Sequence, residues 1–588
     1  MARVDAWYLR RGGATDLAER VQHLDPVLAK VLYARRIDTP DLARAFLYPP
    51  DDAADPLTMA GMPQAVERLI RALREREPIA VYGDFDADGV TATALLTLAL
   101  RALGGIVTPY IPDRFNEAYG LNKPALKRLY DAGTRLVVTV DCGVRSVAEV
   151  AYANALGLDV VITDHHSVPD ELPPALAVVD AKREDCAYPF KDLAGVGVAF
   201  RLAQALYEAA SRERVAIRGA ADPSEFLDLV AVGTVADIVP LRGENRSLAQ
   251  RGLARLRASA RPGIDALTVA AGIPREEVDS TDIAFRLGPR LNAAGRLLEQ
   301  NDNGQSGAHL ALDLLLTGNP EEARALAAKL NQINAERQDL LERQLDRARE
   351  LLGEAQGRPF LFVHDPDFHE GIVGLIASRL SDEFYRPSLV MRRGKRSSRG
   401  SARSIEGIHI THALDENAAL LTRWGGHALA AGVTLPTANL DPLEERLTAF
   451  CEAHLDGVGD GPKQYVDAII TLDEITPETL AALAMMEPCG EGNPEPALAT
   501  RKLRVMTVRA VGQDGKHLRL DVRDDASGTT RHRSGNGRVL PAIGFRLGHM
   551  AESLRVGDSI DLVYRPTLNV WQGQASLQLV VQAIRPAT

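Results

Sequence analysis

The stretch from Ile79 to Leu96, IAVYGDFDADGVTATALL, constrains the fold of this chain more than any other. Its first four residues are apolar or aromatic, as in a buried strand, and the run after Gly89 can begin a helix. Between them lie three carboxylates, Asp84, Asp86 and Asp88. Carboxylates gathered at one strand end repel one another, so they require a cation or raised pKa values. The stretch favours a metal site, although a solvated acidic turn with a helix-capping Asp would equally explain a single DxD.

Further along the chain, apolar runs alternate with helical segments at regular spacing. The strand-like runs are IAVYGDFD, IVTPYI, RLVVTVDCG, LDVVITDHH and AVVDA. This alternation predicts an α/β fold with a parallel, doubly wound sheet and right-handed crossovers. Ligands of such sheets bind beyond the carboxyl ends of the strands. The residues predicted at these ends are Asp84, Asp86 and Asp88, then Asp141, then Asp164, His165 and His166.

The residue types at these strand ends indicate which metal would bind. Carboxylate oxygens with one or two imidazole nitrogens suit Mn²⁺ or Mg²⁺ better than a structural zinc, which favours thiolates. Adjacent histidines at a strand tip should project to opposite sides, so we expect only one of His165 and His166 to be a direct ligand. Asp237 adds a further acid after the apolar run LDLVAVGTVA, which periodicity cannot assign to strand or helix. The alternative for Asp237 is a surface Asp at a helix end.

Composition limits the class of protein. A chain of 588 residues is too long for one core and suggests three or four domains. The start of the chain lacks an apolar signal-peptide core, and no stretch of about 18 uncharged apolar residues occurs, so we expect a cytoplasmic protein that does not enter a membrane. The four cysteines form no CxxC pair. A formal charge of -11 argues against indiscriminate nucleic-acid binding but not against a local basic groove.

Residues beyond the first sheet predict a second α/β unit. Thr317 to Leu352 is expected to form one long helix with Asn319 as its cap, spanning about 50 Å. The acid-free run RRGKRSSRGSAR that follows the next strand suits either phosphate contact or a solvated face. GGHALAAG places His427 after a glycine pair and ahead of an expected helix, a second anion-binding geometry.

The last 125 residues contain short alternating segments bounded by turn residues, which predict a small barrel. Trp571, Arg531, Arg533 and Arg538 could supply stacking and charge for a single strand. The alternative is a barrel that only braces the other domains.

These motifs carry a resemblance to a known family. YGDFDADG, VDCG, TDHH and VGTVADIVPL resemble the DHH phosphoesterase superfamily. Longer blocks are similar, in the same order, to its family of single-strand-specific exonucleases. They are IPDRFNEAYGLN, FKDLAGVGVAF, FRLGPRLNAAGRL, SARSI, GGHALAAG and GEGNPEP. The similarity covers about residues 60 to 588, and one departure, VVDAKRED in place of an Asn-Pro pair, does not fall on a ligand position.

The resemblance implies a domain order and a set of site residues. The domains would be an N-terminal helical segment (1–60), a parallel-sheet DHH domain (61–316), a connecting helix (317–353), a smaller α/β DHH-associated domain (354–460) and an OB-fold barrel (463–588). Two divalent ions, Mn²⁺ or Mg²⁺, would be held by Asp86, Asp88, Asp141, His165 and Asp237, with Asp84 and His166 close by. Asp141, on the middle strand, is the candidate bridge between them. The implied phosphate contacts are Arg114, Arg290, Arg296, Ser401, Arg403 and His427.

The activity implied by the resemblance is digestion of single-stranded DNA from one end into 5′-mononucleotides, in DNA repair and recombination. The 5′ to 3′ direction comes from the family alone, because the phosphodiester backbone does not dictate polarity. A single-strand-binding protein and a helicase are candidate partners, and we expect a monomer. Two alternatives remain: a relative that cleaves short oligoribonucleotides or small nucleotides, and a non-catalytic replication scaffold.

Overall fold

The computed structural model describes residues 7–11, 15–49, 54–117, 120–215, 218–220, 222–258, 261–300, 305–456, 458, 461–524, 537–571 and 574–587. The chain forms two compact units. The small unit comprises Met1–Pro49, Gly459–Glu487 and Pro494–Thr588, and the large unit comprises Pro50–Val458 and Pro488–Asn493. None of the described helices combines the length and the apolar character needed to cross a membrane.

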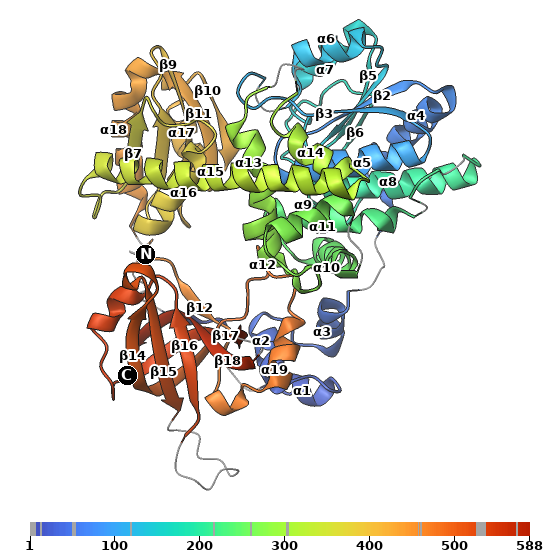
Figure 1. Cartoon of the computed structure of the whole chain (residues 1–588). Helices are drawn as coiled ribbons and strands as arrows, with labels where there is room; N and C mark the ends of the chain where they lie inside the picture. Colours follow the sequence, from blue (N-terminus) through green and yellow to red (C-terminus); the bar gives the residue numbers. More distant parts are fainter. Residues whose placement is uncertain are drawn as a thin grey trace. The chain divides into compact units, whose positions relative to one another are not determined.

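A five-stranded parallel sheet organises the first half of the large unit (Figure 1). Its order is β3-β2-β4-β5-β6, with bounds β2 Pro78–Tyr82, β3 Ile106–Tyr110, β4 Leu136–Val140, β5 Asp159–Thr163 and β6 Ala177–Val179. The strands are largely apolar because helices cover both faces. Ile79 and Val81 pack on one side, and Ala80 and Tyr82 on the other. The predicted doubly wound parallel sheet is confirmed.

The helices divide between the two faces of this sheet. α4 (Met62–Glu75), α5 (Ala87–Ala102), α8 (Gly195–Arg212) and α9 (Leu227–Ala236) share a core with one face, and α6 (Lys123–Asp131) and α7 (Val147–Leu156) with the other. The run before Asp237 is therefore a helix. Further helices of this half are α10 Gly243–Ala258, α11 Pro262–Ala270, α12 Ser280–Asp282, α13 Gly288–Leu297 and α14 His309–Leu316.

Figure 1 shows α15 (Pro320–Leu352) as one long helix. Its side chains contribute to two hydrophobic cores. Leu330 and Ile333 belong to the core of the first sheet, whereas Leu341 and Leu345 belong to the core under the next one. The Asn319 side chain accepts from Glu321 N at 2.9 Å, which satisfies a backbone donor at the start of the helix. The predicted long helix is confirmed.

The second sheet of the large unit has the order β10-β11-β9-β8-β7. Its strands are β7 Leu361–Asp365, β8 Ser388–Arg392, β9 Ser397–Arg403, β10 Arg423–His427 and β11 Ala430–Pro436, and its helices are α16 Val373–Phe384, α17 Ile410–Asp415 and α18 Leu440–His454. The expectation of a helix after GGHALAAG is wrong. β10 and β11 form an antiparallel pair, because Ala431, Val433 and Leu435 alternate into the core with a strand period.

The small unit contains a closed five-stranded barrel, since β14 pairs with both β15 and β17 and the order continues through β16 and β18. Its strands are β14 Leu498–Val511, β15 His517–Asp524, β16 Val539–Gly544, β17 Ser559–Trp571 and β18 Gln574–Pro586. The remaining elements are β1 Trp7–Leu9, α1 Leu17–Arg20, α2 Pro26–Ala34, α3 Pro40–Leu47, β12 Gln464–Val466, β13 Ala468–Ile469 and α19 Pro477–Ala484. β1 pairs in parallel with β12, so the N-terminal segment folds with the barrel rather than with the sheet that follows it. The predicted α/β architecture with a C-terminal barrel is confirmed.

Of the barrel residues that the sequence suggested for strand binding, the structure describes only some. Arg531, Arg533 and the Trp571 side chain lie outside the described residues. Arg538 donates to the carbonyls of Leu472 and Ile475, both at 2.7 Å. Arg538 therefore braces the barrel against the segment before it.

A candidate metal centre and the arginines beside it

Three acids of the first motif gather where β2 gives way to α5. Asp86 is the N-cap of α5, and its Oδ1 accepts from the backbone N–H groups of Asp88 and Gly89, both at 3.0 Å. Asp84 and Asp88 are buried, at 4% and 1% exposure. Capping at a helix N-terminus stabilises negative charge, and it fixes these carboxylates at one end of the sheet.

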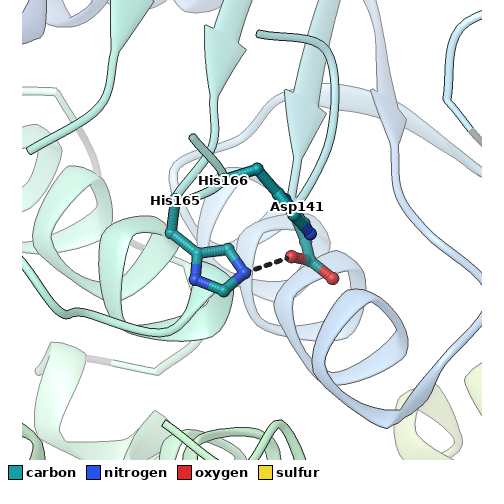
Figure 2. Close-up of side chains that lie close together, drawn as sticks. All are labelled: Asp141, His165 and His166. Carbon is teal, nitrogen blue, oxygen red and sulfur yellow. Dashed lines mark ion pairs between the residues drawn. The ribbon is translucent and has the colours of Figure 1, made fainter. Parts of the chain in front are cut away.

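The His165 side chain lies close to acids from different strands and helices. Its Nε2 lies 3.0 Å from Asp141 Oδ1, 3.6 Å from Asp237 Oδ2 and 3.9 Å from Asp88 Oδ2. Figure 2 shows the His165 ring directed at the Asp141 carboxylate. Asp141 follows β4, the central strand, and Asp237 ends α9. Asp237 is thus at a helix end but not a solvated surface residue, because its side chain is only 20% exposed.

His166 is held by Asp164. Its Nδ1 lies 2.8 Å from Asp164 Oδ1, the same oxygen that accepts from the backbone N–H of His165 and of His166. The expectation that the two histidines project to opposite sides is wrong, since their ring centroids are 4.5 Å apart. The strand ends at Thr163, and the Asp164 side chain accepts from the next two backbone N–H groups, so strand alternation no longer applies.

The backbone around Asp141 and at the start of α8 shapes the centre. Asp141 has a positive φ of 61°, uncommon for a non-glycine residue. A Cβ on Gly195 would lie 2.6 Å from the Asp141 Cβ, so only glycine fits there. Gly195 and Val196, at the start of α8, donate their N–H groups to the Asp88 carboxylate at 2.7 and 2.9 Å.

A fourth strand end carries an acid that sequence reasoning missed. Asp180 follows β6 and is fully buried, and burial raises its pKa to about 7. Lys182, two residues later, donates to the His165 carbonyl at 2.5 Å. The signal was present in AVVDA, where an apolar strand ends in Asp as in the neighbouring strands.

The electrostatics show that this cluster cannot hold its full negative charge alone. Burial, followed by repulsion from Asp86, raises the pKa of Asp84 to about 8 and that of Asp88 to about 7. Burial and then the charge of Asp88 raise the pKa of both Asp141 and Asp237 well above its usual range. Burial lowers the pKa of His165 to about 3, so its imidazole is neutral at pH 7 and can donate a lone pair.

These residues fit divalent cations. Within the described part of the chain, Asp84 Oδ1, Asp237 Oδ2 and His165 Nε2 are buried atoms without a hydrogen-bond partner. Among the residues that the structure describes, three sets have ligand atoms within 4.8 Å of one another: Asp84, Asp86 and Asp141; Asp88, His165 and Asp237; and Asp141, His165 and His166. Asp141 and His165 each occur in two sets, which is the arrangement expected where neighbouring cations share ligands.

Cationic side chains gather next to the acids. The Arg114 guanidinium stacks 4.3 Å from the centroid of the Phe85 ring, between Asp84 and Asp86 in sequence. Burial lowers the pKa of Arg296 and of Arg403, and in both the charge of Arg114 lowers it further. Arg403 donates to Ser401 Oγ at 2.8 Å. Arginines that repel one another in a partly buried setting provide a site for an anion.

The other two predicted phosphate contacts lie further out. Arg290 donates through Nε to Asn331 Oδ1 on α15 at 3.0 Å and through Nη1 to the Arg286 carbonyl at 2.7 Å. His427 is exposed on β10, and partial burial followed by the charge of His166 lowers its pKa. The structure thus brings Arg114, Arg296, Ser401 and Arg403 together, with His427 near His166 and Arg290 against the long helix.

Comparison with known proteins agrees with this architecture. The model of the DHH family, N-terminal domain, matches residues 78–234, the DHHA1 domain matches residues 357–453, and the RecJ OB domain matches residues 466–583. The single-stranded-DNA-specific exonuclease RecJ of Bacillus subtilis (strain 168) is 38% identical over 565 residues, which cover 95% of this chain and 68% of that protein.

Solved structures show the same likeness. The crystal structure of RecJ in complex with Mn²⁺ from Thermus thermophilus superimposes with a TM-score of 0.80 at 30% identity, covering 99% of this chain and 80% of that one. The complex with Mg²⁺ from the same organism gives a TM-score of 0.75 at 29% identity, covering 99% and 78%. With one fold, one order of domains and this identity along nearly its whole length, the chain belongs to the RecJ family of single-stranded-DNA-specific exonucleases.

Proposed function

We propose that this chain is a metal-dependent exonuclease that hydrolyses single-stranded DNA from its 5′ end into 5′-mononucleotides. The observation that carries this proposal is a cluster of acids, with buried oxygens that have no hydrogen-bond partner among the described residues, next to a group of partly buried arginines. The first suits divalent cations and the second suits a phosphate. Membership of the RecJ family, whose curated relatives are named single-stranded-DNA-specific exonucleases, supports the same substrate.

Asp86, Asp88, Asp141, His165 and Asp237 are the proposed ligands, with Asp141 shared between two Mn²⁺ or Mg²⁺ ions. Bound there, the ions would lower the pKa of a water and neutralise charge on the reacting phosphodiester. Asp84 lies beside Asp86 and Asp141 and would complete the negative charge around them. His166, positioned by Asp164, would face the substrate oxygens rather than a metal.

The arginines would hold the strand through its phosphates and fix its position. Arg114, Arg403 and Ser401 would bind the phosphate at the strand's end, and Arg296 would add charge between that phosphate and the acids. His427 would approach the same phosphate from β10. Contacts to phosphate oxygens position a strand without reading its sequence, so we expect little sequence preference.

This function also places the chain among other DNA-processing proteins. Its substrate implies the cytoplasm as its location, a helicase and a single-strand-binding protein as partners that expose or coat single strands, and action as a monomer. Co-purification and a sedimentation measurement would test these finer points.

A gel of strands labelled at either end tests the function. With Mn²⁺, a single strand labelled at its 5′ end should release label as mononucleotide at once, whereas 3′ label should shorten progressively. A blunt duplex should resist, because its bases are paired and no single strand is free to enter the site. Equal rates on duplex and single strand would contradict the proposal, and cleavage confined to di- and trinucleotides would favour the oligoribonucleotide-type relative.

A further inference from the structure

A hollow of about 500 Å³ lies in the large unit, away from the metal centre. Its lining includes Ala102, the last residue of α5, and Asp228, in the first turn of α9. The metal centre lies at the opposite end of each helix, where Asp86 caps α5 and Asp237 ends α9. The 16 residues of α5 span about 24 Å, so the hollow and the metal centre are separate sites.

Among the described residues that line this hollow, arginines outnumber acids. The arginines are Arg101 on α5, Arg218 in the loop after α8, Arg255 in the last turn of α10, and Arg261, which precedes α11. The acids are Glu225 and Asp228. The lining therefore carries a net positive charge, which favours an anionic ligand.

One of these arginines is paired with an acid, and two others are not. Arg261 donates through Nε and Nη2 to the carboxylate of the buried Asp228, at 2.9 and 2.8 Å. Arg101 and Arg255 each donate to a backbone carbonyl, at 3.1 and 3.2 Å. In the described part of the chain, neither of these two lies within ion-pair distance of a carboxylate. A guanidinium has five N–H donors, so both keep donors and charge for a ligand.

Apolar groups complete the lining of the hollow. They are Leu98, Ala102, Ala220 and Phe226. Hollows of about 300–1,000 Å³ that combine apolar lining with a few convergent polar groups bind small molecules. Planar guanidinium groups match phosphate oxygens, often through two parallel N–H···O bonds. The lining therefore suits a ligand that joins phosphates to an apolar ring.

We propose that this hollow binds a small ligand with a chain of phosphates, of which a nucleoside triphosphate is the fullest match. A chain of phosphates reaches arginines of several segments at once and offers more negative charge than a single phosphate. In the described part of the chain, every group of acids and histidines able to hold a metal lies at the candidate metal centre. The hollow therefore holds its ligand without hydrolysing it. The inference does not rest on the proposed function, because no residue of this lining takes part in it.

Binding of inorganic triphosphate and of dATP tests the site. The arginines beside the metal centre also suit phosphate, so the metal-free full chain carries Arg114→Ala and Arg403→Ala in every measurement. Calorimetry should show one triphosphate per chain. Arg255→Ala, and separately Arg101→Ala, should weaken its binding by about 10-fold or more, as for one lost charge-assisted hydrogen bond. By the same reasoning dAMP, which reaches fewer arginines, should bind at least about 10-fold more weakly than dATP.

Arg257→Ala is the matched control for Arg255→Ala. Both arginines lie in the last turn of α10 and donate Nε to one backbone carbonyl, at 2.8 Å for Arg257 and 3.2 Å for Arg255. Only Arg255 is among the described residues that line the hollow. Both variants should therefore lose similar thermal stability, whereas only Arg255→Ala should lose affinity for triphosphate.

The two probes also separate the possible sources of the phosphate chain. Tighter binding of dATP than of inorganic triphosphate would assign the ligand as a nucleotide, and equal binding would assign the phosphate chain alone. The proposal would be overturned if neither probe bound, if Arg255→Ala and Arg257→Ala lost equal affinity, or if dAMP bound as tightly as dATP.

Discussion

Buried aspartates occur in both units but differ in the hydrogen-bond partners around them. In the small unit, Asp467 is 3% exposed and accepts from Arg35 at 3.0 and 2.8 Å and from Ala497 N at 3.0 Å. In the large unit, Asp84 is as deeply buried, yet its Oδ1 has no hydrogen-bond partner among the described residues, and burial raises its pKa to about 8. The first carboxylate has its partners within the protein, and the second has the setting expected of a carboxylate near a cation.

This contrast separates structural from functional burial of charge. A buried carboxylate paired with arginine and backbone N–H groups holds segments together, as Asp467 ties Arg35 of the N-terminal segment to Ala497, the residue before β14. A buried carboxylate surrounded by other acids destabilises the fold unless a ligand binds. Replacing an aspartate with an uncharged residue should therefore have different consequences in the two units.

The largest effect is expected at Asp141. Asp141→Ala removes the ligand proposed to be shared, so hydrolysis of a single strand should fall by more than about 10³-fold, while strand binding stays because the arginines are untouched. Rate and affinity are measured on the same labelled strand. A variant that kept more than about a tenth of the wild-type rate would remove Asp141 from the metal ligands. Without added metal, this variant should also melt at a higher temperature than the wild type, since repulsion within the cluster falls.

The matched change in the small unit is Asp467→Ala. It removes the carboxylate that the buried Arg35 guanidinium contacts, so the small unit should lose about 3–5 kcal/mol of stability. Denaturant unfolding followed by tryptophan emission measures this loss. Cleavage of a dinucleotide should keep its wild-type rate at low temperature. Loss of that rate with an intact fold would mean that Asp467 serves function rather than structure.

A smaller effect distinguishes two arginines. Arg403→Ala should weaken single-strand binding and reduce the slope of log affinity against log salt by about 0.7, as for one lost phosphate contact. Arg538→Ala should leave that slope unchanged and lower only thermal stability, because its side chain donates to two backbone carbonyls. Binding titrations at two salt concentrations and a melting curve check both. A salt slope altered by Arg538→Ala and not by Arg403→Ala would reverse their roles.

The sequence predicted the sheet and the positions of its acids because apolar strands and strand-end carboxylates are local patterns. Asp84, Asp141 and His165 each follow a strand that period and composition identify. The relation between His165 and His166 depends instead on the hydrogen bonds that their backbone N–H groups donate to the Asp164 side chain, which the strand period does not reveal. The GGHALAAG hairpin was missed because alternation begins only at Ala430, after two glycines.

Contacts between segments far apart in the chain are the other feature that the sequence did not predict. Nothing local in Trp7–Leu9 indicates that it pairs with Gln464–Val466. The segment Pro488–Asn493 packs in the large unit, where the Ser280 hydroxyl donates to the Cys489 carbonyl at 2.7 Å. Deleting residues 463–588 would therefore remove contacts from the large unit and unpair β1, so point variants separate the two units more cleanly than truncation.

Counting bound Mn²⁺ tests the central claim most directly. Calorimetric titration of the metal-free wild-type chain should show two Mn²⁺ ions per chain, with protons released as the carboxyl groups of raised pKa ionise. Asp141→Ala should bind at most one ion, and weakly, whereas Asp467→Ala should still bind two. Two ions bound with unchanged affinity by Asp141→Ala, or none bound by the wild-type chain, would contradict the account of a cation site built from clustered buried acids.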